Sequence, residues 1–290
     1  MSKVEVAARR RNVLGEGVCW EPRRERLYWV DILSRRLEWL NPQSGESGAW
    51  TLDVKPSVIA PLADGGLILG TSKGVIIFDP TTGDVEHLFE LEPDRPNNRT
   101  NDGGVDRQGR FWLGTMADGG PENSGAVYRI DRDWTATRVI DGLGIPNTLQ
   151  ISPDGRTLYV ADSRAKVIWA YDLDPKTGAL GYRHVFADTK GQEPTPDGSA
   201  VDVEGCLWNA QWGGSRIVRY TPDGEIDRIV ETPVSQPTKC AFGGPGLATL
   251  YVTSAREGLS EAQLEAEPLA GSLFRFDPGV RGLAAVPFGG

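Results

Sequence analysis

The sequence is poor in cysteine and histidine, and it contains no long apolar run. Only three of its 290 residues are cysteine and two are histidine. Three cysteines are too few for a disulfide scaffold, so we expect free thiols and a reducing environment. No apolar stretch approaches the eighteen residues that a membrane helix needs, and residues 1–11 lack the apolar segment of a secretory signal. These absences predict a cytoplasmic protein.

An excess of positive charge is also missing. The net charge is −9, and Lys and Arg cluster only around residues 9–11 and 23–26. Such a chain repels nucleic acid and anionic membranes, so we expect neither as a partner. His87 and His184 lie in sequences typical of outer strands, which argues against a His-rich zinc site or a serine-histidine hydrolase. Nucleophile-elbow, phosphate-loop and dinucleotide motifs are absent from the sequence.

What the chain does have is a repeat of short strands, broken by 36 glycines and 20 prolines. Helical periodicity occurs only near residues 260–267. Six units can be aligned on the second strand of each. These strands read RLYWVD (26–31), GLILGT (66–71), RFWLGT (110–115), TLYVAD (157–162), CLWNAQ (206–211) and TLYVTS (249–254).

Each unit contains four strands, and this pattern predicts an all-β, six-bladed propeller with four-stranded antiparallel blades. We expect a single domain over residues 1–290. The ring would close through residues 3–8, as an outer strand beside the C-terminal segment LAAVPF (283–288). The predicted assembly state is a monomer or a small homo-oligomer.

The segment TPDGSAVDVEGCLW (195–208) contains two turn signals only six residues apart. Glu204-Gly205 matches the hairpin loops of the other units, so Pro196-Asp197-Gly198 is interpreted as lying before the first strand, at one mouth of the channel. Counting back ten or eleven residues from the first Leu or Phe of every second strand reaches a polar residue each time, and these residues should form a ring. They are Glu16, Ser57, Asn101, Asn147, Asp197 and Lys239.

Three members of this ring offer oxygen ligands. Glu16, Asn147 and Asp197 would supply two carboxylates and one amide oxygen, a set that suits Ca²⁺, Mg²⁺ or Mn²⁺ and less typically Fe²⁺ or Zn²⁺. The alternative is a plain salt-bridge ring with Lys239. Cys240 is interpreted as core packing.

Arg99 and Asn101 flank the start of the first strand of blade three, so both are candidates to hydrogen-bond a polyhydroxylated ligand. For Arg99 the alternative is an ion pair with a surface carboxylate. The loop at 117–125 is longer than its counterparts and would form a rim over the mouth. The segment DLDPKTGALGYR (172–183) begins like a calcium loop, but Arg183 replaces the required glutamate, so we interpret it as a hairpin turn.

Several motifs resemble the SMP-30/gluconolactonase/luciferin-regenerating enzyme family, which includes regucalcin. They are LGEGVCWEP (14–22), NNRTNDGGVDRQGRFWLGTM (97–116), IPNTLQISPDGRTLYVAD (145–162), TPDGSAVDVEGCLWNAQWGG (195–214) and TKCAFGGPGLATLYVTSAREG (238–258). The likeness runs from about residue 12 to the C-terminus. NNR, ENSGAVYR and WGG resemble the bacterial xylonolactonases and arabinolactonases most.

The resemblance implies a propeller that binds one divalent cation and hydrolyses sugar lactones. It implies Glu16, Asn147 and Asp197 as metal ligands, Asp197 as acid or base, and Arg99 and Asn101 as substrate contacts.

Two departures from the family pattern stand out. Pro146-Asn147-Thr148 replaces a common Ser-Asn-Gly. Asp118 is followed by glycines where relatives carry a second acid, so Asp118 or Glu122 would have to supply that substrate contact.

The sequence analysis therefore predicts metal-dependent hydrolysis of a sugar lactone to the aldonic acid. The alternative function is a calcium-binding regulatory protein of the regucalcin type. A propeller scaffold for other proteins is a third possibility, which would favour a broad apolar or charged face over single polar residues on an axis.

Overall fold

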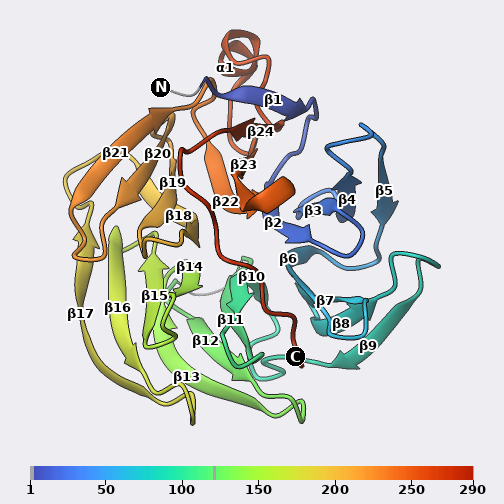
Figure 1. The fold of residues 1–290 in the computed structure, drawn as a ribbon. Coiled ribbons are helices and arrows are strands. Elements are labelled where there is room, and N and C mark those ends of the chain that lie inside the picture. Colours follow the sequence, from blue (N-terminus) through green and yellow to red (C-terminus); the bar gives the residue numbers. More distant parts are fainter. Residues whose placement is uncertain (1–2, 120–121, 290) are drawn as a thin grey trace.

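The computed structural model describes residues 3–119 and 122–289, and almost all of the regular elements in this part of the chain are strands. The strands form six four-stranded antiparallel sheets arranged around a common centre (Figure 1). This arrangement confirms the predicted six-bladed propeller.

In the first five blades the strands follow chain order from the centre outwards. Blade one has β2 (Gly15–Glu21), β3 (Arg26–Asp31), β4 (Arg36–Leu40) and β5 (Ser47–Thr51). Blade two has β6 (Pro56–Pro61), β7 (Leu67–Thr71), β8 (Gly74–Phe78) and β9 (Val85–Phe89). Blade three has β10 (Asn98–Val105), β11 (Phe111–Ala117), β12 (Gly125–Ile130) and β13 (Ala136–Leu143).

The remaining blades complete the ring. Blade four has β14 (Pro146–Ile151), β15 (Thr157–Asp162), β16 (Val167–Leu173) and β17 (Leu180–Asp188). Blade five has β18 (Thr195–Val201), β19 (Leu207–Trp212), β20 (Arg216–Tyr220) and β21 (Ile226–Glu231). Blade six has β22 (Pro237–Gly243), β23 (Thr249–Ser254), β24 (Leu273–Phe276) and β1 (Glu5–Ala8). Blade six also carries the 3-10 turn η1 (Pro245–Leu247) and the helix α1 (Glu261–Ala266).

The helix lies where the periodicity predicted one. Ser260 caps its N-terminus, and the backbone N–H of Gln263 donates to the Ser260 side chain while the Gln263 side chain accepts from the Ser260 backbone. This reciprocal pair satisfies two amide groups that a short helix otherwise leaves without partners.

Ring closure differs in part from the sequence prediction. β1 is the outer strand of blade six, as expected, but its partner is β24, with Val6 opposite Phe274. The predicted partner, residues 283–288, instead crosses the centre of the ring (Figure 1). There it is held by short bridges from Gly282 to Asp202 and from Phe288 to Leu62. The tail therefore covers one mouth of the channel. It is not needed as a partner for β1, because β24 fills that role.

The core lies between the blades. Every residue of the second strands β7, β11, β15, β19 and β23 is buried or half-buried, since neighbouring blades cover both faces. At one such interface the Trp208 ring meets Phe242 and Phe276, with centroids 6.5 and 6.0 Å away. The two histidines lie exposed in the outermost strands β9 and β17, as predicted.

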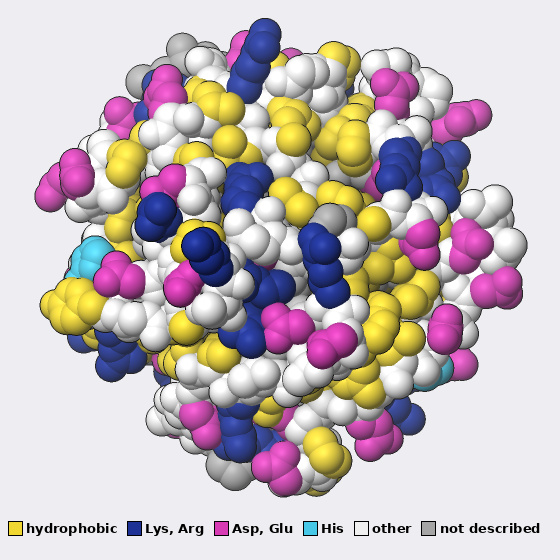
Figure 2. Space-filling model, turned by 60° about the horizontal axis from the view of Figure 1, so that its bottom comes forward, with side chains coloured by type: hydrophobic (Ala, Val, Ile, Leu, Met, Phe, Trp, Pro, Cys, Tyr) yellow, Lys and Arg dark blue, Asp and Glu magenta, His cyan; other side chains and the backbone are white. Residues whose placement is uncertain are grey.

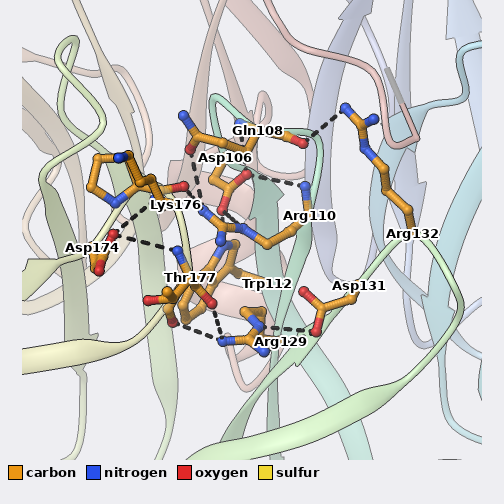
Figure 3. Close-up of polar contacts among 12 residues, drawn as sticks. Asp106, Gln108, Arg110, Trp112, Arg129, Asp131, Arg132, Asp174, Lys176 and Thr177 are labelled. Carbon is orange, nitrogen blue, oxygen red and sulfur yellow. Dashed lines mark hydrogen bonds and ion pairs between the residues drawn. The ribbon is translucent and has the colours of Figure 1, made fainter.

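A buried aspartate locks the hairpin between the first and second strands of blade three (Figure 3). Asp106 Oδ2 accepts hydrogen bonds from Arg110 Nε at 2.6 Å and from Trp112 Nε1 at 2.9 Å. Arg110 also donates to the Pro175 carbonyl of the next blade at 2.9 Å. Pro175 belongs to the DPKTG segment, which forms the predicted hairpin turn between β16 and β17. The network therefore fixes both the turn and the contact between blades.

The surface carries mixed charge. On the face shown in Figure 2, Lys and Arg side chains lie among Asp and Glu side chains. Among residues 3–119 and 122–289, no helix has the length and hydrophobicity required to span a membrane. All three cysteines are free thiols, and Cys240 is buried in an apolar cluster, as predicted.

Candidate metal and substrate site

Each first strand contains an irregularity at the same place, and the six ring residues predicted from the sequence lie in or beside it. Pairing between the first and second strands shifts register between Glu16 and Cys19 in blade one, and between Pro196 and Ser199 in blade five. The other four blades have matching shifts after Pro56, Thr100, Asn147 and Pro237. An extra residue in one strand redirects its side chain away from the regular alternation. These bulges explain how polar side chains point into the channel from strands that are otherwise apolar.

The interpretation of Pro196-Asp197-Gly198 as a segment before the strand is wrong. β18 begins at Thr195, and Asp197 lies inside it, in the bulge. A bulge and a turn both favour Gly and Asp, so the tripeptide alone does not separate them.

The three proposed ligands line one cavity. Glu16, Asn147 and Asp197 all face a cavity of about 260 Å³ at the mouth opposite the C-terminal tail. Glu16 is only 7% exposed, Asn147 3% and Asp197 6%. The Asn147 side chain is held from both ends, because its Nδ2 donates to Ser163 Oγ at 2.9 Å and its Oδ1 accepts from Asn101 Nδ2 at 3.1 Å.

The backbone around Asn147 is strained. Thr148 has φ of 74° and Leu149 has φ of 30°, a region that side-chain-bearing residues rarely adopt. Thr148 is held there because its Oγ1 donates to the Asp197 carbonyl at 2.9 Å. The departure from Ser-Asn-Gly therefore keeps the glycine-like backbone and adds a hydrogen bond that ties blade four to blade five.

Two acids of this cavity, Glu16 and Asp197, are buried without an ion-pair partner among the described residues. In the described part of the chain, neither Glu16 nor Asp197 has a Lys or Arg nitrogen within 4.0 Å. Burial and the Asp102 carboxylate raise the pKa of Glu16 to about 8. Burial, together with the charges of Glu16 and Asp102, raises the pKa of Asp197 well above its ordinary value. Uncompensated buried carboxylates are unfavourable, and two of them beside an amide oxygen fit a divalent cation.

Lys239 does not form the salt-bridge ring that was the alternative interpretation. Its Nζ forms a buried ion pair with Oδ1 of Asp102, which is not one of the three proposed ligands. Asp102 Oδ2 has no hydrogen-bond partner among the described residues. Burial opposes the charge on Lys239, but the adjacent Asp102 outweighs it, so the pKa of Lys239 is raised. Lys239 therefore neutralises Asp102 beneath the site and leaves the acids above without a paired cation.

Arg99 and Asn101 line the same cavity. Arg99 Nη1 donates to the Thr100 carbonyl at 2.9 Å and to Asn101 Oδ1 at 2.8 Å, while its Nε has no hydrogen-bond partner in the described part of the chain. Arg99 Nε also lies 3.7 Å from Asp118 Oδ1. The Arg99 side chain is only 7% exposed. The contact with a carboxylate, predicted as the alternative role of Arg99, therefore exists, but it is a long contact at the cavity and not an ion pair on the surface.

The loop at 117–125 is only partly described. Asp118 Oδ2 pairs with Lys55 Nζ at 2.6 Å, and Glu122 Oε1 pairs with Arg164 Nη1 at 2.7 Å. Neither acid is among the residues that line the cavity. Residues 120 and 121, at the centre of the predicted rim, lie outside the described residues.

Sequence reasoning missed several residues of the cavity wall. Their common feature is that they lie at or just after the ends of second strands, which reach the same mouth where the first strands begin because the hairpins are antiparallel. They are Met116, Ser163, Trp212 and Glu257. A residue count carried forward through the second strands would have found Met116, Ser163 and Trp212, which occupy equivalent positions, but not Glu257, which lies further along its segment. Asp102 was missed as well, although it directly follows a ring residue and precedes two glycines.

A second acidic group lies at the opposite end of blade five. Asp202, Glu204 and Cys206 bring ligand atoms within 4.8 Å of one another. Arg219 occupies this group, with Nη2 at 2.8 Å from Asp202 Oδ2 and 2.5 Å from Glu204 Oε2. Because the guanidinium already forms ion pairs with both carboxylates, the group is an ion-pair network that fixes a hairpin.

Comparison with known proteins places the chain in a family. Residues 14–256 match the family model described as SMP-30/Gluconolactonase/LRE-like region, and the chain belongs to this family. It is 35% identical to 6-deoxy-6-sulfogluconolactonase of Pseudomonas putida, over 99% of both chains. It is 38% identical to L-arabinolactonase of Azospirillum brasilense, over 97% of this chain and 93% of that one.

A solved structure shares the whole fold. Regucalcin of Agrobacterium tumefaciens strain C58, described as a calcium-binding protein, superimposes with a TM-score of 0.95 at 33% identity, over 99% of this chain and 97% of that one. The resemblance recognised from the sequence motifs is therefore confirmed.

Proposed function

We propose that this protein hydrolyses a sugar lactone to the aldonic acid and that it uses one divalent cation to do so. The observation that carries the proposal is the pair of buried, unpaired acids Glu16 and Asp197 facing one cavity with the amide oxygen of Asn147. Relatives over nearly the full length are named as sugar lactonases, which supports the same reaction class here.

Glu16, Asn147 and Asp197 would hold the ion. These ligands are all oxygens, which favours a hard cation such as Ca²⁺, Mg²⁺ or Mn²⁺ and allows Fe²⁺ or Zn²⁺. When bound, the cation supplies a Lewis acid that stabilises negative charge on the lactone carbonyl oxygen.

The chain's own groups handle the substrate and the protons. Arg99 and Asn101 contact the sugar hydroxyls and orient the ring. Asp197 accepts a proton from the water that attacks the carbonyl carbon, and it returns that proton to the ring oxygen as the carbon–oxygen bond breaks. The product is the open-chain aldonic acid, and no other co-reactant is consumed.

The proposed partner is therefore a small sugar lactone, with no role for nucleic acid or membrane. We propose a single catalytic domain over residues 1–290, since β1 closes the ring on β24. A monomer or small homo-oligomer and a cytoplasmic setting complete the proposal.

One experiment tests both the ion and the acid. Wild type, Asp197→Ala and Asp223→Ala are treated with EDTA, then assayed on pentono- and hexonolactones with each of the five ions added back. Asp223 belongs to a second Pro-Asp-Gly triplet, which lies in the exposed turn between β20 and β21, so it is a matched control. We expect EDTA to abolish turnover, one or more ions to restore it, and Asp197→Ala to lose about 100-fold or more.

Asp223→Ala should retain wild-type turnover, and circular dichroism should show all three proteins folded. The proposal fails if Asp197→Ala turns over normally. A calcium-binding regulatory role is the second candidate, favoured by the oxygen-only ligand set and by the calcium-binding description of the Agrobacterium structure. Calcium binding without turnover on any lactone would establish that alternative.

A further inference from the structure

Glu257 stands at the rim of the same cavity and is held there by its backbone. It lies in the segment between β23 and α1 and lines the cavity. Its N–H donates to the Val13 carbonyl at 2.9 Å, and its carbonyl accepts from Gln236 Nε2 at 3.1 Å. The side chain is exposed, and within the described residues its carboxylate has neither an ion-pair nor a hydrogen-bond partner. The fold thus places a free acid where a ligand would enter.

The other charged groups around the cavity each lie near a group of opposite charge. Four ionisable residues line it, namely Glu16, Arg99, Asp197 and Glu257. In the proposed function a cation neutralises Glu16 and Asp197, and Arg99 lies 3.7 Å from Asp118, a carboxylate that it shares with Lys55. The nearby cations Lys55 and Arg164 are themselves paired with Asp118 and Glu122. Glu257 is therefore the acid of the cavity wall that neither the proposed cation nor an ion pair within 4.0 Å neutralises among the described residues, although the charge of Arg99 acts on it across the cavity.

The wall also offers an apolar surface to one face of a ring. Leu14, Met116, Ile145 and Trp212 line the cavity, and Trp212 packs against the buried cluster that contains Leu14. Aromatic and aliphatic side chains suit the C–H face of a sugar, whereas its hydroxyls need polar partners. A lactone that lies on this surface, with its ring carbonyl at the acids, extends its distal carbons towards the rim.

We propose that Glu257 sets the charge specificity of the site: its carboxylate accepts a hydrogen bond from a distal hydroxyl of a neutral lactone and repels lactones that carry a distal carboxylate or sulfo group. The inference rests on the proposed function and narrows its substrate class to neutral aldonolactones. The Pseudomonas putida relative is named for a sulfo-substituted gluconolactone, a substrate that the inference disfavours for this chain.

The test uses two substrates that differ only at the distal carbon. D-glucono-1,4-lactone ends in a hydroxymethyl group, and D-glucaro-1,4-lactone ends in a carboxylate. The kcat/KM of each is measured for the metal-loaded wild type, Glu257→Gln and Glu265→Gln. Glu265 is an exposed acid on α1 that does not line this cavity, so its variant matches the change in net charge.

We expect wild type to prefer the neutral lactone and Glu257→Gln to reduce that preference about two- to fivefold, through a lower KM for the anionic substrate. Glu265→Gln should leave the preference unchanged. Added salt should weaken the preference of wild type more than that of Glu257→Gln, because the variant lacks one of the charge–charge interactions that salt screens. Equal preference in all three proteins would overturn the inference.

A binding measurement separates this inference from the proposed function. Methyl β-D-glucoside and methyl β-D-glucuronide form a neutral and anionic pair that no lactonase can hydrolyse, and calorimetry gives their affinities for the calcium-loaded proteins. If wild type hydrolyses no lactone, the proposed function fails, and the affinity ratio alone decides the role of Glu257. A ratio that Glu257→Gln leaves unchanged, or no binding of either probe, overturns the inference.

Discussion

At the scale of single residues, the site concentrates buried charge. Glu16, Asp102 and Asp197 lie near one another with a single buried lysine, Lys239, paired to Asp102. Burying three carboxylates against one ammonium is costly unless another cation is present. The arrangement therefore sacrifices stability in the metal-free protein, and it is expected to regain stability when a cation binds.

Replacing Lys239 tests this charge balance. Lys239→Met removes the ammonium and keeps the bulk of the side chain, so Asp102 is left buried without a partner. We expect the free energy of unfolding in EDTA to fall by about 3 kcal/mol. Urea denaturation followed by circular dichroism measures this change.

The matched control is the double variant Asp102→Asn/Lys239→Met, which removes both charges of the pair. It should recover most of the loss, because a neutral amide is far less costly to bury than a carboxylate. A double variant as unstable as Lys239→Met would show that side-chain packing, rather than charge, explains the loss.

At the scale of the strand, the bulges decide where the ligands point. Gly17 occupies the bulge of β2 with φ of 62°, and a Cβ added there would lie 2.6 Å from the Ser57 carbonyl oxygen of the next blade. A side chain at this position therefore meets both an unfavourable backbone conformation and a steric clash. The same bulge orients the preceding residue, Glu16.

Gly17→Ala is the corresponding prediction. We expect unfolding to be easier by about 2 kcal/mol, since the backbone strain and the clash add. Weaker binding of a divalent cation should follow because Glu16 is displaced. Thermal unfolding and calorimetry measure the two effects.

Gly45→Ala serves as the control. Gly45 has φ of 77° in an exposed turn, with nothing within 4 Å of an added Cβ. This variant should lose only the conformational part, about 1 kcal/mol, and keep normal affinity for the cation. If both variants bind the cation alike, the bulge at Gly17 does not position Glu16.

At the scale of the whole molecule, the ring depends on one strand from the N-terminus. Blade six takes β1 from the N-terminal part of the chain, and this strand covers the edge of β24. A sheet edge without a partner is prone to pair with other chains. Closing the ring also joins the first and last blades, so it contributes to every interface between blades.

Removing residues 1–8 should therefore lower the melting temperature and cause association through the exposed β24 edge. Differential scanning calorimetry and light scattering measure these effects. A chain that lacks only residues 1–3 keeps β1 and is expected to melt like the wild type. Equal melting temperatures and a monodisperse profile for both truncations would exclude the closing role of β1.

The sequence by itself determined the number of blades and the ring of six polar residues, because strand period, hairpin turns and repeat spacing are local properties of the chain. It also placed Glu16, Asn147 and Asp197 at equivalent positions of three blades, and the structure brings all three to one cavity. Only the tertiary structure decided which residues from other strands join them.

Three features of the protein were decided only by the tertiary structure. Asp102 takes Lys239 as its partner across the channel, Glu257 reaches the rim from blade six, and β1 pairs with β24 rather than with the C-terminal tail. Each joins residues far apart in the sequence, and no local pattern encodes such contacts. They arise because the closed ring brings the ends of all six blades to one axis.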